Sequence, residues 1–369
     1  MKHCTSLAFT ILAFAGMLTG CRVRSVPFKH EGTMRMSGKM NGDMSLSGNM
    51  GVNGKLQTEI LTGGDKRDSP LKPVVVDGDA KKHDQRIAII DVDGILVDRN
   101  ATALLSASEN PVALFREKCA AVTDDERVKA VVLRINSPGG GATATDIMAR
   151  EIERLRETRK IPIVACVMDV GTGGAYYLAS QCDHIIAHPT SLVGGVGIIL
   201  NVYNLEDTMG QFNILSTPIK SGEKIDAGTP ERPIASGELD MLQQIADSFH
   251  QRFIGQIIRR RPDLQTNRDL WTDGEVFAGS NAAEVHLVDQ IGYIDEAIAE
   301  AKRRADRKDD WAVQMYRRTD NHAYTVLDRV PDGVAMPSLF PIHIPGMDRS
   351  SMPTFLFMWQ SDPAMASSL

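Results

Sequence analysis

The sequence lacks an excess of positive charge and has few cysteines, and each shortage excludes a class of protein. The 369 residues carry a formal net charge of −6, so there is no basic surface of the kind that binds nucleic acid, and we expect no nucleic-acid partner. The five cysteines form neither a metal-ligand spacing nor an even disulfide set. No metal or organic cofactor is implied, and the cysteines that follow residue 100 are expected to pack as buried apolar side chains.

The N-terminus also lacks an apolar run of the roughly 20 residues that a membrane-spanning helix needs. The apolar run Leu7–Leu18 follows a basic residue and leads to Leu-Thr-Gly just before Cys21. This pattern is typical of a secretory signal of the bacterial lipoprotein type, in which the cysteine is lipidated. We therefore expect residues 1–20 to be a signal and Cys21 to hold an exported lipoprotein on the membrane, at the periplasmic or cell-envelope face. An uncleaved anchor helix is the alternative.

Two further segments precede the main domain. From residue 33 to residue 57, methionine, glycine and leucine alternate with mostly polar residues, and two Asn-Gly pairs interrupt the pattern. This period of two predicts a β-like Met/Gly-rich segment over residues 21–61. Because methionine sulfur is a soft ligand, Cu(I) binding is the alternative interpretation. Residues 62–85 are rich in Gly, Asp, Lys and Pro and are expected to be a linker.

The middle of the chain alternates apolar strands with helices. We expect strands from residue 86 and at 130–136 and 161–169, and helices at 111–122 and 144–159. Strands that are apolar throughout and alternate with helices indicate a parallel sheet covered on both faces. The predicted fold class is therefore α/β.

Residues 306–369 form a C-terminal extension that is less regular. It contains several prolines and an apolar run at Phe355–Trp359. We expect this run to pack on the domain or to pair as an edge strand. Membrane contact through its aromatic side chains is the alternative, although no amphipathic helical period supports it.

Asp91 and Asp93 end the first strand in the peptide DVDGILVD. Two carboxylates in this arrangement resemble the acidic pair of haloacid-dehalogenase-type phosphatases and could hold Mg²⁺. Ile95 replaces the usual threonine, however, and the later lysine and paired-acid motifs are absent. We expect a strand end with solvated acids.

Two glycine-rich turns are the stronger candidates for a site. The strand that ends near Ser137 is followed by Gly139, Gly140 and Gly141, and the peptide GTGGAYYLAS, which contains Gly174, repeats the design about thirty residues later. Glycines after a strand let backbone N–H groups point into a site, where they can stabilise an oxyanion during acyl transfer. A helix N-terminus also favours developing negative charge.

Five peptides then occur in the order and spacing of one known family: RINSPGG, GGAYYLAS, SLVGGVGI, IKSGEKIDAG and DGEVFAGSNAAEVHLVDQIGYIDEAI. Over residues 86–305 they resemble the signal peptide peptidase A family, membrane-associated serine peptidases of the Clp protease/crotonase superfamily. The resemblance implies a core of repeated ββα units and peptide or signal-peptide-like substrates. It also implies a homo-oligomer with its active sites near subunit contacts, and Gly139 and Gly140 beside the oxyanion.

The catalytic pair of that family is substituted here. The family's serine nucleophile lies in the pattern S-G-G-Y-Y and its lysine base in K-S-G-x-x-K-D, and a lysine can act as a base only when burial lowers its pKa. In an ungapped comparison the serine falls on Gly173 and the lysine on Ile225. Gly195 likewise stands where the family often has serine.

Each lost group has a competent neighbour one residue upstream, Thr172 and Lys224. If an insertion and a deletion compensate, Thr172 is the nucleophile and Lys224 its base. If the register is ungapped, a one-residue offset on a helix turns a side chain by about 100° and the pair is inert. We favour the ungapped register, because two substitutions are more economical than two compensating indels.

The sequence therefore supports two functions. One is a membrane-anchored endopeptidase that cleaves peptides through an acyl-enzyme. The alternative is a catalytically inactive pseudopeptidase that binds peptides or acts in assembly. Crotonase relatives use the same glycine loops on coenzyme A thioesters, but the export signal argues against that cytoplasmic cofactor.

Overall fold

A computed structural model describes residues 69–79, 84–99, 102–103, 106–107, 109–306, 311–318, 323–328 and 355–359. These residues belong to one compact unit of the chain, Lys66–Leu369. The expected signal, Cys21 and the Met/Gly-rich segment lie outside the described residues and stay predictions. Among the helices of the described ranges, none is both long and apolar enough to cross a membrane.

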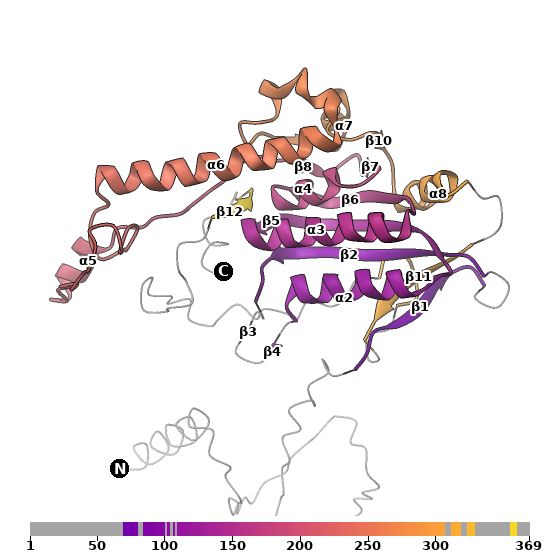
Figure 1. Ribbon diagram of the computed structural model, residues 1–369, viewed down its shortest axis with the longest axis horizontal. Coiled ribbons are helices and arrows are strands. Elements are labelled where there is room, and N and C mark those ends of the chain that lie inside the picture. The colour runs from indigo at the N-terminus through magenta and orange to yellow at the C-terminus, as the bar shows by residue number, and fades with distance from the viewer. Residues whose placement is uncertain are drawn as a thin grey trace, which may run out of the picture. The chain divides into compact units, whose positions relative to one another are not determined.

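The described residues are built around one mixed sheet (Figure 1). Along the sheet the main strands are β1 (Lys72–Asp77), β11 (Ala312–Arg317), β2 (Arg86–Leu96), β5 (Val128–Gly141), β6 (Ile163–Thr172), β7 (His184–Ala187) and β10 (Gln290–Ile291). Neighbours from β11 to β10 are parallel, and β1 is antiparallel to β11. The α/β class and the three expected strands are confirmed.

Helices cover both faces of this sheet. The helices are α2 (Pro111–Asp124), α3 (Ala142–Arg159), α4 (Gly174–Ser180), α5 (Glu206–Gln211), α6 (Ser236–Arg260), α7 (Gly279–Glu284) and α8 (Ile294–Arg304). Ala88 and Ile90 of β2 pack with α2, α3 and α4, whereas Ile87 and Ile89 pack with α8. This alternation follows from the period of two in a strand. The two core layers explain why the strands are apolar throughout.

Shorter elements complete the unit. They are β3 (Thr102–Ala103), β4 (Ser106–Ala107), β8 (Leu192–Gly194), η2 (Pro262–Gln265), η3 (Arg268–Leu270), β9 (Val276–Ala278) and β12 (Leu356–Met358). β8 pairs with β6 and β9, and β12 pairs with β5. These side pairings all extend the ends of β5 and β6, where the glycine-rich turns lie.

The segments expected to flank the domain contribute strands to it. β1 lies within the expected linker, and its apolar core of three consecutive valines pairs with β11. The Gly, Asp, Lys and Pro residues around this short run predicted a linker. The valines nevertheless form a strand, because β-branched residues favour that conformation. β11 and β12 both come from the expected C-terminal extension. The compact unit is therefore larger than the expected domain of residues 86–305.

The expectations for the cysteines and for Asp91 can both be examined. Cys119, Cys166 and Cys182 are free and buried as expected, and burial raises the pKa of the Cys166 thiol to about 12. Asp91 is not a solvated acid. Its carboxylate is buried against the three cations Arg134 (2.7 Å), Arg317 (3.3 Å) and Lys118 (3.9 Å). Those charges already neutralise Asp91, so little attraction is left for Mg²⁺.

Candidate functional site

The bend between β6 and α4 carries the central residues of the expected site. Thr172 is the last residue of β6 and Gly174 the first of α4, so Gly173 alone forms the bend. Its backbone angles are φ 54° and ψ −124°, and a positive φ of this kind favours glycine. The strand-to-helix bend is where a catalytic nucleophile is typically exposed. In this chain that position has no side chain.

Thr172 lies on the strand side of the bend and is 0% exposed. Its hydroxyl donates a hydrogen bond of 3.2 Å to the carbonyl oxygen of Pro138, in the first glycine-rich turn. The hydroxyl therefore links β6 to β5. Within a single chain, Thr172 therefore has a structural role, because its hydroxyl holds the ends of β5 and β6 together.

The two glycine-rich turns meet at the bend. Gly139 has φ +103°, and a Cβ atom added there would lie 2.7 Å from the amide nitrogen of Gly174. The Ser137 hydroxyl accepts a 3.1 Å hydrogen bond from the Gly139 amide and so shapes the first turn. Gly139, Gly173 and Gly174 thus lie together, whereas a Cβ atom at Gly140 would collide with the backbone of Leu96 on β2.

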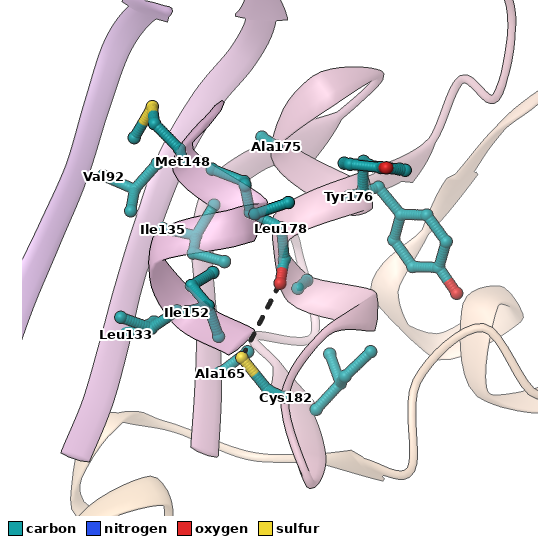
Figure 2. Close-up of a cluster of buried hydrophobic side chains, with 14 of the residues drawn as sticks. Val92, Leu133, Ile135, Met148, Ile152, Ala165, Ala175, Tyr176, Leu178 and Cys182 are labelled. Atoms are coloured by element: carbon teal, nitrogen blue, oxygen red, sulfur yellow. Dashed lines mark hydrogen bonds between the residues drawn. The ribbon is translucent and has the colours of Figure 1, made fainter. Parts of the chain in front are cut away.

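Packing of α4 fixes the direction of the bend. Every residue of α4 is buried, and Figure 2 shows Ala175 and Leu178 within a cluster that includes Ile135 of β5 and Ile152 of α3. The Tyr176 hydroxyl donates a 2.9 Å hydrogen bond to the carbonyl oxygen of Leu287. A short helix that is buried on all sides has little freedom to rotate, so Gly173 cannot give its place on the bend to Thr172 without repacking this core.

A third glycine-rich turn supports the bend from β8. Gly194 and Gly195 both have positive φ, and a Cβ atom at Gly195 would lie 3.3 Å from the Cβ atom of Thr172 and 3.4 Å from the amide nitrogen of Gly173. The Gly195 amide donates a 2.7 Å hydrogen bond to the carbonyl oxygen of Glu275. Gly195, the second position at which the family often has serine, therefore lies against the bend.

The candidate base lies elsewhere in the chain. Lys224 is exposed, and its Nζ atom is 3.9 Å from the position of an added Cβ at Gly237, in the first turn of α6. The part of α6 that reaches α4 is Phe253, whose ring centroid is 5.0 Å from that of Tyr177. More than four helical turns, about 24 Å at 1.5 Å per residue, separate Gly237 from Phe253. One chain therefore does not bring Lys224 to Thr172.

The loop around Lys224 is held by other charges. Lys220 forms a 2.9 Å ion pair with Asp226, which Arg232 also binds at 2.7 Å, and Arg232 in turn binds Glu238 of α6. These hydrogen bonds hold the pKa of the Asp226 carboxyl well below its usual range. Ile225, the family's base position, is 74% exposed. It belongs to a set of exposed apolar side chains in the segment that follows α5: Phe212, Ile214, Leu215, Ile219 and Ile225.

The site has one component that the sequence did not place. β12 pairs antiparallel with the first glycine-rich turn, so that Phe357 faces Gly140 and Met358 faces Gly139. On its other side β12 forms a bridge to Ile199. We call the backbone position between the turn 139–141 and Ile199 the strand site, and β12 fills it. Figure 1 shows β12 beside the end of β5.

The carbonyl group of Phe357 points at the bend. A Cβ atom added at Gly173 would collide with the Phe357 carbonyl oxygen and lie 2.7 Å from its carbonyl carbon, and one added at Gly139 would collide with the same oxygen. The apolar run of Phe355–Trp359 indicated a strand, but no sequence signal indicated its partner.

Thr145 is a second residue of the site that the sequence did not indicate. It is fully buried, and its hydroxyl has no hydrogen-bond partner among the described residues. A Cβ atom added at Gly174 would collide with that hydroxyl.

Comparison with known proteins yields one family. The model of peptidase family S49 matches residues 156–308, from the end of α3 past the end of α8. The chain is 28% identical to Protease 4 of Haemophilus influenzae over 231 residues, which cover 63% of this chain and 37% of that protein. It is 31% identical to the chloroplastic serine protease SPPA of Arabidopsis thaliana over 191 residues, 52% of this chain and 28% of that protein. The chain thus spans less than half the length of these two relatives.

Proposed function

This chain belongs to peptidase family S49 and has the Clp/crotonase-like α/β core expected of it, and from that premise we propose that it binds extended peptides at the strand site without forming an acyl-enzyme. The observation that carries the proposal is the bend residue. Gly173 has no side chain, and the Phe357 carbonyl group fills the space in which one would begin. Acyl transfer requires a nucleophilic side chain within reach of the carbonyl carbon.

The environments of Thr172 and Lys224 also support binding without turnover. The Thr172 hydroxyl is fully buried and donates to the Pro138 carbonyl oxygen. Lys224 is exposed beside the start of α6, more than four helical turns from the part of that helix that contacts α4. Displacement of a reacting group by about 1 Å can already lower a rate by roughly 10²-fold. A one-residue shift at both positions is a much larger displacement.

The names of the relatives favour a second candidate, peptide cleavage by Thr172 with Lys224 of a second copy as its base. In that reaction the Thr172 hydroxyl attacks the substrate carbonyl carbon and its proton passes to the neutral lysine amine. The lysine then protonates the departing amine of the cleaved peptide bond. Water hydrolyses the resulting ester, which frees the carboxylate product and restores the threonine hydroxyl.

One experiment separates the two functions. Full-length protein is incubated with casein and with signal-like peptides beside Thr172→Val, Thr172→Ser, Lys224→Ala and Lys224→Arg variants. Our proposal expects no cleavage and no covalent fluorophosphonate adduct in any form, with peptide binding retained. Cleavage that Thr172→Val and Lys224→Ala abolish, and that Thr172→Ser keeps, would overturn it. The conservative variants control for misfolding.

Location and assembly complete the proposal. Lipidation of Cys21 would hold the protein on the membrane, on the periplasmic or cell-envelope face, and the sequence pattern before Cys21 supports this. Intact mass of membrane-extracted protein beside a Cys21→Ala variant tests it. A homo-oligomer is supported by the exposed apolar side chains of the segment that follows α5, because clustered exposed apolar groups mark interaction surfaces.

A further inference from the structure

We infer that the segment Phe355–Trp359 is an internal peptide ligand of the strand site, and that the site selects extended apolar peptides with aromatic residues at the positions of Phe355 and Phe357. The inference rests on the proposed function, because it names the ligand class of the same site. The inference goes beyond the proposed function in two ways. It assigns the specificity to named side chains of α4 and α6, and it identifies a segment of the chain itself that competes with peptides for the strand site.

The backbone contacts of the segment are those of a bound peptide strand. On one side, the Ala142 amide donates to the Phe355 carbonyl oxygen (3.1 Å) and the Trp359 amide donates to the Pro138 carbonyl oxygen (3.2 Å). On the other side, Leu356 and Ile199 exchange two hydrogen bonds of 2.9 and 3.0 Å. Addition of a strand to a sheet edge is a common mode of peptide recognition, in which main-chain bonds supply affinity independently of sequence.

Alternate side chains of the segment enter an aromatic cluster. The Phe357 ring is 3% exposed and lies 4.8 Å from the Phe253 ring and 6.1 Å from the Tyr177 ring, centroid to centroid. The Phe355 ring lies 5.3 Å from that of Phe249, edge to face. Aromatic pairs at these separations are favourable beyond the burial of their area. Residues two apart in a strand share a face, so the two contacts select a pattern and not a single residue.

The cluster is built to keep its shape. The Tyr177 hydroxyl donates a 3.0 Å hydrogen bond to Asp146 of α3, and Arg252 of α6 binds both oxygens of the same carboxylate at 2.9 Å. Tyr177 is therefore fixed by three helices at once. A fixed aromatic side chain gives up little conformational entropy on binding, which favours the affinity of a ring that packs against it.

The position of Phe357 relative to the bend indicates which residue of a bound peptide the aromatic cluster contacts. Its carbonyl group is the one that lies against Gly139 and Gly173, so the bond between Phe357 and Met358 occupies the place at which a nucleophile on the bend would act. The aromatic cluster thus selects the residue just before that bond. A peptide that binds from solution needs the same place and competes with the segment.

The test is a titration of fluorescently labelled peptide into the full-length chain. The first peptide is Ser-Phe-Leu-Phe-Met-Trp-Gln, and the second has alanine in place of its second phenylalanine. The proteins are the wild type, Phe357→Ala to weaken the internal strand, and Phe357→Ala with Phe253→Ala. Leu327→Ala, at an exposed site in the described C-terminal part of the chain, is the matched control. The rate of hydrogen exchange at the amides of Leu356 and Trp359 reports whether the internal strand is bound at the strand site.

We expect the first peptide to bind Phe357→Ala at least about tenfold more tightly than it binds the wild type or Leu327→Ala, because the competitor is weakened. We expect the second peptide to bind Phe357→Ala at least about tenfold more weakly than the first, and this preference to fall in the Phe253→Ala background. The amides of Leu356 and Trp359 should be protected in the wild type.

Three results overturn the inference. Equal affinity of the wild type and Phe357→Ala for the first peptide would show that the segment does not compete. Equal affinity of Phe357→Ala for the two peptides would show that the aromatic cluster does not select. In both cases peptide binding itself, and with it the proposed function, would stand. Binding of neither peptide to any variant would overturn the proposed function as well.

Discussion

The Gly173 amide donates a 2.9 Å hydrogen bond to the carbonyl oxygen of Gly194, and through it the bend of β6 is tied to the third glycine-rich turn. The bond extends the parallel pairing in which Thr172 lies opposite Gly194. Because it fixes the backbone of residue 173, it also fixes which residue forms the bend. The register that the sequence left open is therefore held by backbone contacts from two neighbouring segments.

Substitution of Gly173 should destabilise the protein even though it only adds a methyl group. Gly173→Ala places a Cβ atom at positive φ and against the Phe357 carbonyl group, and we expect a loss of at least about 2 kcal/mol in the free energy of unfolding. Urea denaturation measures it. Gly255→Ala, in open space on α6, is the control and should stabilise by about 0.5–1 kcal/mol. Equal effects of the two changes would contradict the geometry of the bend.

The Tyr177 hydroxyl should contribute to stability through Asp146. Tyr177→Phe removes the 3.0 Å hydrogen bond to that carboxylate, and we expect a loss of about 1 kcal/mol in the free energy of unfolding. Tyr203→Phe, at a half-exposed tyrosine, should change it by less than about 0.5 kcal/mol. Chemical denaturation of both variants checks the difference, and a neutral Tyr177→Phe would mean that Asp146 does not hold the ring.

Assembly should depend on the exposed apolar side chains beyond α5. Leu215→Glu and Ile219→Glu place a charge among the exposed apolar residues of the segment that follows α5, and a charge is costly to bury in an interface. We expect these variants to elute as a smaller species, with mass determined by light scattering. Leu270→Glu, at an exposed leucine of η3, should leave the mass unchanged. A wild-type mass that equals one chain would refute the expected homo-oligomer.

Acid should weaken the protein partly through Glu300 of α8. Hydrogen bonds from Arg303 and Arg304 hold the pKa of this carboxyl at about 2, below its ordinary 4.5, although burial opposes the shift. The stabilising contribution is therefore present above pH 4.5 and is lost as the pH falls toward 2. Glu300→Gln should flatten the fall in melting temperature over this range, and Asp240→Asn, on the exposed face of α6, should not. A parallel fall in Glu300→Gln and the wild type would contradict this.

Local pattern was sufficient to predict the central strands and helices. Apolar runs predicted β2, β5 and β6 within a few residues. Asn110 caps the start of α2 close to the expected residue, and its side chain accepts hydrogen bonds from the amides of Val112 and Ala113. The glycine-rich turns after the second and third of these strands were also predicted, and they lie at the ends of β5 and β6. These features depend on interactions between near neighbours in sequence.

The remaining features of the fold and the site depend on contacts between residues that lie far apart in the sequence. The apolar run of β12 is compatible with any open strand edge, so its pairing with Gly140 followed only from the shape of the whole sheet. The distance between Lys224 and the bend was hidden for a related reason, since it depends on the direction in which the long helix α6 leaves the core. Sequence motifs list residue types in order, and they do not state which chain supplies each one.

The strand site has a consequence for the time course of folding. Gly140 and Phe357 pair although they lie far apart in the sequence, and Phe357 leaves the ribosome long after Gly140. At about 5–20 residues per second, the turns around Gly139 are synthesised many seconds before β12 exists. During that interval an unpaired backbone edge faces its surroundings, and such an edge is a template for pairing with other chains. β12, which is made long after the turns, is thus the strand that closes this edge.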